Sequence, residues 1–248
     1  MDKAVWMSWY DLPTQGREEY LQWLHGDYIP RLLKKPGVKW AGHYASAKVP
    51  PAPRLTHVKD QPTGNDFMLL LGGENAHTFT KGPGYYMHPE KKLRPKLEPE
   101  LSDRDHGMLA MRANERVTIM IEENRVDGPE AANREGPMVP GASLQLGNFC
   151  ANSVAAEDEL LSWFGDWRLD ALKNLPGIIG ARTLVGTVGW ARHGCMYEFI
   201  SEAARVENYP KIRDLYPDAA HWTERFTRNL IHAVGSPMVA NRIWPPVR

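Results

Sequence analysis

Residues 19–44 of the chain, EYLQWLHGDYIPRLLKKPGVKWAGHY, return 140 positions later in altered form as residues 159–184, ELLSWFGDWRLDALKNLPGIIGARTL. The two stretches share seven identical residues without a gap, whereas average composition would give about two. Trp23 matches Trp163, and Pro36-Gly37 matches Pro176-Gly177. The sequence of 248 residues therefore contains one folding unit twice.

Each copy contains the same series of predicted elements. A short apolar run precedes an amphipathic helix, a Pro-Gly pair ends that helix, and a strand begins at once. A third strand, a second helix and a closing strand complete the order β-α-β-β-α-β. The predicted ranges in the two copies are strands Val5–Tyr10 and Leu144–Cys150, helices Arg17–Lys34 and Glu157–Leu175, strands Val38–Ser46 and Ile178–Val188, strands Asp66–Leu71 and Cys195–Ile200, helices Leu101–Arg112 and Asp218–Leu230, and strands Arg116–Glu122 and Met238–Trp244.

The strand with residues 67–71, FMLLL, is apolar on both faces. An antiparallel sheet with helices on one side normally leaves its other face to water, so this sheet needs a cover. The second copy can supply that cover if the two sheets pack face to face with the helices outside. We therefore predict an α+β fold of two tandem ferredoxin-like units, residues 1–135 with an inserted loop at about 74–99, and residues 136–248.

The overall composition excludes several classes of partner. Thirty basic and thirty acidic side chains balance, which gives no electrostatic reason to expect nucleic acid or an anionic membrane. No run of about 18 apolar residues is present, and the first residues do not resemble a signal peptide. With only two cysteines, the chain is expected in the cytoplasm. We expect a monomer that is itself a pseudo-dimer, or a homodimer.

Residues 23–37, WLHGDYIPRLLKKPG, resemble the first helix of the dimeric α+β barrel superfamily, and the EthD-like branch is the most similar. The second copy departs from this pattern, with Gly165 in place of His25 and Asp170 in place of Pro30. Superfamily members include cofactor-free monooxygenases, isomerases, cyclases, and haem enzymes of the dye-peroxidase and chlorite-dismutase kinds. The resemblance implies a small-molecule cavity between the sheet and the helices of one unit.

The first copy supplies three candidate catalytic residues. On a helical wheel His25 lies about 40° from Leu21, so it points at the sheet, where an imidazole could act as acid or base. Tyr28 lies one turn further along, and His43 in the second strand lies on the face opposite Trp40 and Tyr44. Tyr28 or His43 could bind a developing negative charge. The alternative is that His25 and Tyr28 are ordinary core residues. Pro30 is expected to bend the helix.

The second copy supplies candidate binding residues. Arg168 occupies the position of Tyr28, and a cation on a core-facing stripe needs a partner. Glu198, in an otherwise apolar strand, is the predicted partner. The pair is either structural or a clamp for a substrate carboxylate. Arg182 is a further candidate on the preceding strand.

The insertion at residues 74–99 has no counterpart of similar length in the second copy. It contains Tyr85 and Tyr86 between Gly82-Pro83-Gly84 and Pro89. Paired aromatic residues in such a loop predict a lid or a pocket wall that contacts substrate. A solvated loop, or an arm that grips a second subunit, fits the same pattern.

Known cofactor motifs are absent. The sequence has no G-x-G-x-x-G after a strand, no phosphate-binding P-loop, no H-E-x-x-H and no paired C-x-x-C. We therefore predict no organic cofactor and no metal. The favoured function is a lyase, isomerase or decarboxylase that uses acid–base chemistry on a small aromatic molecule. The alternatives are a haem-dependent dehydratase-like or peroxidase-like enzyme and a non-catalytic ligand-binding or stress-related barrel.

Overall fold

The computed structural model describes residues 2–49, 64–80, 101–134, 139–215 and 217–247. We call residues Ala4–Asp127 the first unit and Ser143–Trp244 the second unit. The strands are β1 Ala4–Asp11, β2 Val38–Ser46, β3 Phe67–Gly73, β4 Ala113–Asp127, β5 Ser143–Ala151, β6 Ile178–Val188, β7 His193–Phe199, β8 Leu230–His232 and β9 Met238–Trp244. The helical segments are α1 Arg17–Trp23, η1 Leu24–Tyr28, α2 Ile29–Leu33, α3 His77–Thr80, α4 Asp103–Ala110, η3 Ala131–Asn133, α5 Val154–Trp163, η4 Phe164–Arg168, α6 Leu169–Lys173, α7 Glu202–Asn208, η5 Tyr209–Lys211, α8 Ile212–Leu215 and α9 Pro217–Thr227.

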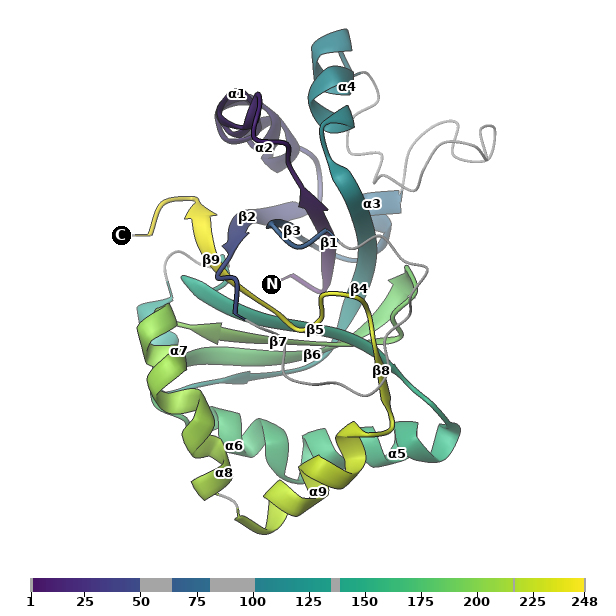
Figure 1. Cartoon of the computed structure of the whole chain (residues 1–248), viewed down its shortest axis with the longest axis vertical. Helices are drawn as coiled ribbons and strands as arrows, with labels where there is room; N and C mark the ends of the chain where they lie inside the picture. Colours follow the sequence, from purple (N-terminus) through teal and green to yellow (C-terminus); the bar gives the residue numbers. More distant parts are fainter. Residues whose placement is uncertain (1, 50–63, 81–100, 135–138, 216, 248) are drawn as a thin grey trace.

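The strands form a closed antiparallel barrel (Figure 1). In the first unit the order is β4-β1-β3-β2, and in the second unit it is β6-β7-β5-β9. The units join where β4 pairs with β6 and where β2 pairs with β9, and β8 extends from β5. The predicted fold of two ferredoxin-like units is therefore confirmed. The predicted boundary between residues 135 and 136 lies outside the described residues.

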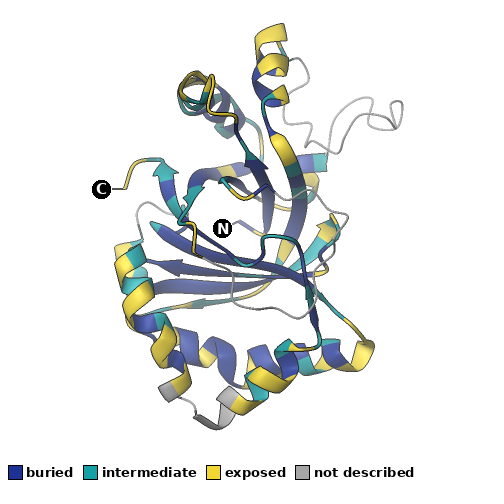
Figure 2. Ribbon diagram, in the orientation of Figure 1, coloured by how far each residue is buried: buried dark blue, intermediate teal, exposed yellow. Residues whose placement is uncertain are grey.

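Alternation along the strands separates three apolar cores. In β1, Val5, Met7 and Trp9 point into the barrel, whereas Trp6 and Tyr10 point toward helices α1, α2 and α4. A third core lies between the sheet of the second unit and helices α5, α6 and α9. Figure 2 shows the consequence: most strands are buried along consecutive residues, with exposed stretches on β4, and exposed residues gather on the outer sides of the helices. No helix among the described residues is long and apolar enough to cross a membrane.

The first helix of each unit contains a π turn at the same place. The turns are η1 and η4, and their bounds differ by the 140 residues of the repeat. The π turn does not depend on Pro30. Asp170 stands at that position in the second unit, and the π turn is still present there. π turns inside helices are rare overall, and those that occur are often found at functional sites. Both begin directly after the repeated tryptophan.

The repeated tryptophans make equivalent contacts. Trp23 Nε1 donates a hydrogen bond to Asp105 of α4 at 2.9 Å, and Trp163 Nε1 donates one to Thr223 of α9 at 3.0 Å. Each thus ties the first helix of its unit to the second helix. The two acceptors differ in chemistry, but the position of the tryptophan is the same.

In the first strand of each unit, the offset between equivalent residues differs by one from the 140 residues that relate the two helices. Tyr10 pairs with Phe67 in the first unit, and Phe149 pairs with His193 in the second. The counterpart of Phe149 is therefore Tyr10, and the register of the first strand differs by one residue from that of the helix. In a strand, a shift of one residue moves a side chain to the opposite face. By the same pairings Ser8 corresponds to Gly147 and Leu69 corresponds to Cys195.

Candidate functional site

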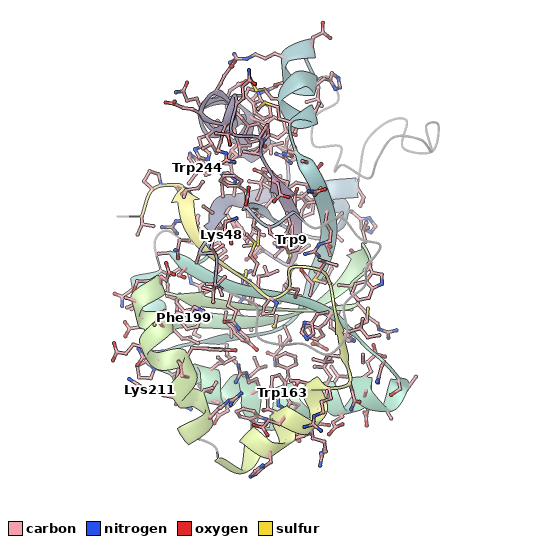
Figure 3. All side chains as sticks on the ribbon, viewed as in Figure 1. Trp9, Lys48, Trp163, Phe199, Lys211 and Trp244 are labelled. Carbon is pink, nitrogen blue, oxygen red and sulfur yellow. The ribbon has the colours of Figure 1, made fainter. Side chains whose placement is uncertain are left out.

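A cavity of about 610 Å³ lies between the sheet and the helices of the second unit (Figure 3, near Trp163). This volume is in the range of pockets that hold drug-sized molecules. Its location matches the one implied by the resemblance to the superfamily. The sheet contributes Gln145, Gly147, Cys195 and Tyr197, the first helix contributes Trp163, Phe164, Trp167 and Arg168, and the later segments contribute Arg205, Tyr209, Arg213, Glu224 and His232.

The cavity is explained by small residues at positions that are larger in the first unit. On the sheet, Gly147 replaces Ser8 and Cys195 replaces Leu69. A Cβ atom added to Gly147 would lie 3.1 Å from the Cys195 sulfur. Together these exchanges remove side-chain volume from the sheet–helix space of the second unit.

Arg168 is the principal charged group at this cavity. It is 6% exposed, and its guanidinium carbon lies 5.3–5.5 Å from the ring centres of four aromatic residues. Those residues are Trp163, Trp167, Tyr197 and Tyr209. Among the described residues no carboxylate forms an ion pair with it; its hydrogen bonds go to the phenol oxygens of Tyr197 at 3.4 Å and Tyr209 at 2.7 Å.

The charge of Arg168 is retained despite its burial. Burial lowers the pKa of Arg168, but the neighbouring Tyr209 and Tyr197 phenols outweigh this effect and the net pKa is raised. The pKa of Tyr197 is raised well above its usual value, chiefly by burial. A permanent cation among neutral phenols and indoles is an environment suited to a planar anion.

A second polar chain extends from Tyr209. The Gln145 amide nitrogen donates to the Tyr209 hydroxyl at 2.9 Å. Arg205 donates twice to the Gln145 amide oxygen, at 3.2 and 3.0 Å. Because a guanidinium can only donate, Arg205 determines the orientation of the Gln145 amide. The orientation of Gln145 in turn makes Tyr209 an acceptor.

In the first unit, the sheet–helix space holds a hydrogen-bonded chain. His25 Nε2 lies 2.8 Å from His43 Nδ1, and His43 Nε2 lies 2.8 Å from the Tyr10 hydroxyl. His25 therefore points at the sheet, as the helical wheel indicates, and His43 faces the helices. Burial lowers the pKa of His25 to about 4. The pKa of His43 is lowered well below its usual value by burial and by the neighbouring charges of His25 and Arg112.

Other side chains of the first unit also lie in this space. Tyr28 stacks on Trp23 with ring centres 4.7 Å apart. Arg112 donates to the Tyr20 hydroxyl at 2.6 Å and forms an ion pair with Glu115 at 2.8 Å. The sequence prediction groups Tyr28 with His25. The structure instead places Tyr10 at the end of the histidine chain.

The predicted ion pair between Arg168 and Glu198 is wrong. Glu198 accepts hydrogen bonds from Arg182 at 3.2 Å and from Arg134 at 3.1 Å. Arg182 also pairs with Asp2. Strand alternation explains the error, because Tyr197 points toward the helices and the adjacent Glu198 must point the opposite way. Arg182 and Glu198 therefore belong to a buried ionic network, not to the cavity.

Sequence reasoning identified Arg168 and missed other residues of the cavity, among them Tyr209 and His232. Tyr209 lies in η5, which follows a helix, α7, that has no counterpart in the repeat alignment. His232 lies in β8, a strand of three residues that the periodic pattern did not reveal. Tyr85 and Tyr86 fall outside the described residues.

The described residues contain no cluster of three or more histidine, cysteine or acidic side chains that could hold a metal ion. Haem needs only one protein ligand to its iron, and histidine is a common one. Among the described cavity residues His232 is the only imidazole, and it is buried. Arg205 and Arg213 also line the cavity and could pair with propionate groups. This set of side chains is compatible with haem.

No family model matches the chain, and no curated protein sequence matches it. Solved structures match along nearly its whole length. An anthrone oxidase-like protein superposes with a TM-score of 0.59 at 11% identity, covering 98% of this chain and 91% of its own. A protein from Fusobacterium nucleatum, provisionally described as a monooxygenase, has a TM-score of 0.56 at 7% identity, covering 97% and 91%. A protein provisionally described as a chlorite dismutase has a TM-score of 0.52 at 12% identity, covering 98% and 95%.

These similarities show that the chain has the dimeric α+β barrel fold, here formed by one polypeptide with two units. At such low identity they show the fold alone. The more specific resemblance to the EthD-like branch stays a prediction.

Proposed function

We propose that this protein is an enzyme that acts, without an organic cofactor, on a small aromatic anion held in the cavity of the second unit. The observation that carries the proposal is Arg168, a buried cation that lines an aromatic cavity and has no carboxylate partner among the described residues. A buried charge without a counter-ion is costly. A ligand with a carboxylate or an oxyanion would supply that counter-ion.

The cavity residues divide into three roles. The indoles of Trp163 and Trp167 provide flat apolar surface for an aromatic ring. Arg168 binds the negative charge. His232, the imidazole among the described cavity residues, accepts a proton from the bound molecule, because an imidazole can exchange protons near neutral pH. This chemistry is that of an isomerase, a lyase or a decarboxylase.

Binding of naphthoate, followed by quenching of tryptophan fluorescence, tests the proposal. Arg168→Met is expected to weaken naphthoate binding about a hundredfold, because the anion loses a buried charged partner. Binding of the neutral acetylnaphthalene should change less than about threefold. Arg116→Met is the matched control, since Arg116 is also buried but lies over Trp9, away from the cavity. Equal naphthoate affinity in wild type and Arg168→Met would exclude an anion site at Arg168.

Haem-dependent chemistry is a second candidate, favoured by His232. When bound, haem would supply redox chemistry, and His232 would hold its iron. Growth with a haem precursor followed by absorption spectroscopy distinguishes the two candidates. A stoichiometric Soret band that disappears in His232→Ala supports haem. A colourless protein that binds naphthoate supports the cofactor-free enzyme.

The first unit offers a third candidate. The hydrogen-bonded chain from His25 through His43 to Tyr10 could move a proton between the half-buried His25 and the buried phenol. We keep the sequence-derived proposal that His25 is catalytic, with Tyr28 and His43 near it. Turnover of His25→Gln on a substrate identified for the wild type tests it.

A further inference from the structure

The hydroxyl group of Tyr209 has an unusual set of partners. Its oxygen accepts one hydrogen bond from Arg168 and a second from the Gln145 amide nitrogen. A guanidinium cannot accept a hydrogen bond, and neither can an amide NH₂ group. The Tyr209 proton therefore points to neither of them. No other acceptor for it is found among the described residues.

The position of Tyr209 gives this proton a direction. Tyr209 lines the cavity and is half-buried. Two guanidinium groups lie close to its ring, Arg168 at 5.4 Å and Arg205 at 5.7 Å from the ring centre. These contacts and the two accepted hydrogen bonds hold the phenol in place. The Tyr209 hydroxyl can consequently donate its hydrogen to a molecule bound in the cavity.

We infer that Tyr209 is a catalytic acid that gives its phenolic proton to a carbonyl oxygen of the substrate. The substrate is then an aromatic compound with an enolisable carbonyl group, and the reaction is a keto–enol isomerisation. This inference rests on the proposed function, since it uses the same cavity and the same base.

The proton and electron balance of the step is simple. His232 takes a proton from the carbon next to the carbonyl group, and the electrons of that C–H bond form a C=C bond. The carbonyl π electrons form a new O–H bond with the proton of Tyr209. The phenolate that remains on Tyr209 keeps the two hydrogen bonds from Arg168 and Gln145, which stabilise its charge. When the enol leaves, His232 releases its proton to solvent and the Tyr209 phenolate takes one up, which restores both residues. When the transfers instead reverse after His232 has exchanged its proton with D₂O, the ketone regains a deuteron at the same carbon.

Exchange of the α-protons of tetralone in D₂O, measured by NMR, tests the inference with an aromatic ketone as the probe. Tyr209→Phe should lower the maximal exchange rate about a hundredfold, in the range of a lost general acid, and change KM by less than about threefold. Naphthoate binding should stay within about threefold of wild type, because Arg168 is retained. Tyr20→Phe is the matched control, since the Tyr20 phenol also accepts a hydrogen bond from a buried arginine, Arg112, but lies in the first unit, away from the cavity. Its exchange rate should stay close to wild type.

The outcomes separate this inference from the proposed function. If wild type binds naphthoate but Tyr209→Phe exchanges tetralone at the wild-type rate, Tyr209 is not the acid. The inference also fails if wild type binds naphthoate but does not exchange tetralone. If wild type binds no naphthoate, the proposed anion site itself fails. An equal loss of rate in Tyr209→Phe and Tyr20→Phe would point to a general loss of stability and overturn the assignment to Tyr209.

Discussion

The two units share a backbone plan but differ in what occupies the space between sheet and helices. In the first unit, Tyr10, His25 and His43 form a hydrogen-bonded chain that fills part of this space. In the second unit, small residues such as Gly147 leave a cavity of about 610 Å³. The fold thus tolerates either a filled or a hollow interior at the same place. A duplicated chain can keep one copy for stability and use the other for a ligand.

The largest effect should come from filling the second unit as the first is filled. Gly147→Leu adds a side chain at a position where the Cβ atom alone would lie 3.1 Å from the Cys195 sulfur. The remaining atoms of the leucine side chain would therefore enter the cavity. Naphthoate affinity, measured by calorimetry, should fall about a hundredfold or more because ligand and side chain compete for one volume. Gly147→Ala, which adds only the Cβ, is the control. Unchanged affinity in Gly147→Leu would place the ligand elsewhere.

A smaller effect is expected when the first unit is made more like the second. Leu160 stands at the position of Tyr20, so Tyr20→Leu has a shape the fold accepts. The substitution should nevertheless destabilise the fold, because the buried Arg112 loses the Tyr20 hydroxyl as its hydrogen-bond acceptor. The free energy of unfolding should fall by about 2 kcal/mol in urea denaturation. Tyr20→Phe, which keeps the ring and removes only the hydroxyl, should account for most of the loss; a stable Tyr20→Phe would show that the hydrogen bond matters little.

The histidine chain predicts a dependence of stability on pH. Burial lowers the pKa of His25 to about 4, and burial together with the charges of His25 and Arg112 lowers the pKa of His43 well below its usual value. In the unfolded chain both titrate near about 6.5, so below that pH the unfolded state binds more protons than the folded state. Stability should therefore be complete above about pH 6.5 and fall as the pH drops toward 4. Urea titrations at several pH values measure this slope.

His25→Gln should make that slope shallower, because one of the two titrating groups is removed. A slope equal to that of wild type would mean that other groups control the acid sensitivity.

The smallest effect on ligand binding is expected from His25→Gln, which changes the first unit only. Naphthoate affinity should stay within about twofold of wild type, because distant and independent sites do not influence each other strongly. A larger change would show that the two units are energetically coupled. Loss of turnover without loss of binding would place the chemistry at His25, as the third candidate requires.

Much of the fold could be predicted because the repeat made each element visible twice. The predicted bounds of β2, β6 and β9 agree with those observed, and the first helix of each unit lies where its apolar stripe indicates. The segment from α7 to η5 was missed because it lies outside the aligned residues 19–44 and 159–184, so the repeat gave no signal for it. The paired π turns were missed because a wheel with a fixed rotation per residue cannot register them. For that reason Leu161, which matches Leu21 in the repeat and was therefore expected on the buried face, is 45% exposed.

The candidate site was less predictable than the fold. The sequence identified Arg168 as a cation on a buried face, and the structure confirms that it is buried. It assigned Glu198 as the partner, although strand alternation places that carboxylate on the other side of the sheet. Tyr209 and His232 could not be connected to Arg168, because they come from segments distant in the sequence.

The sequence by itself determined the order of the elements, the duplication and the burial of Arg168, since these follow from local periodicity and from the internal repeat. Only the tertiary structure decided which unit is hollow and which residues meet in the cavity. The physical reason is that a cavity depends on volumes summed over several elements. Gly147 and Cys195 are each unremarkable in their own segments, and their small size has a consequence only where the sheet and the helices of the second unit enclose the same space.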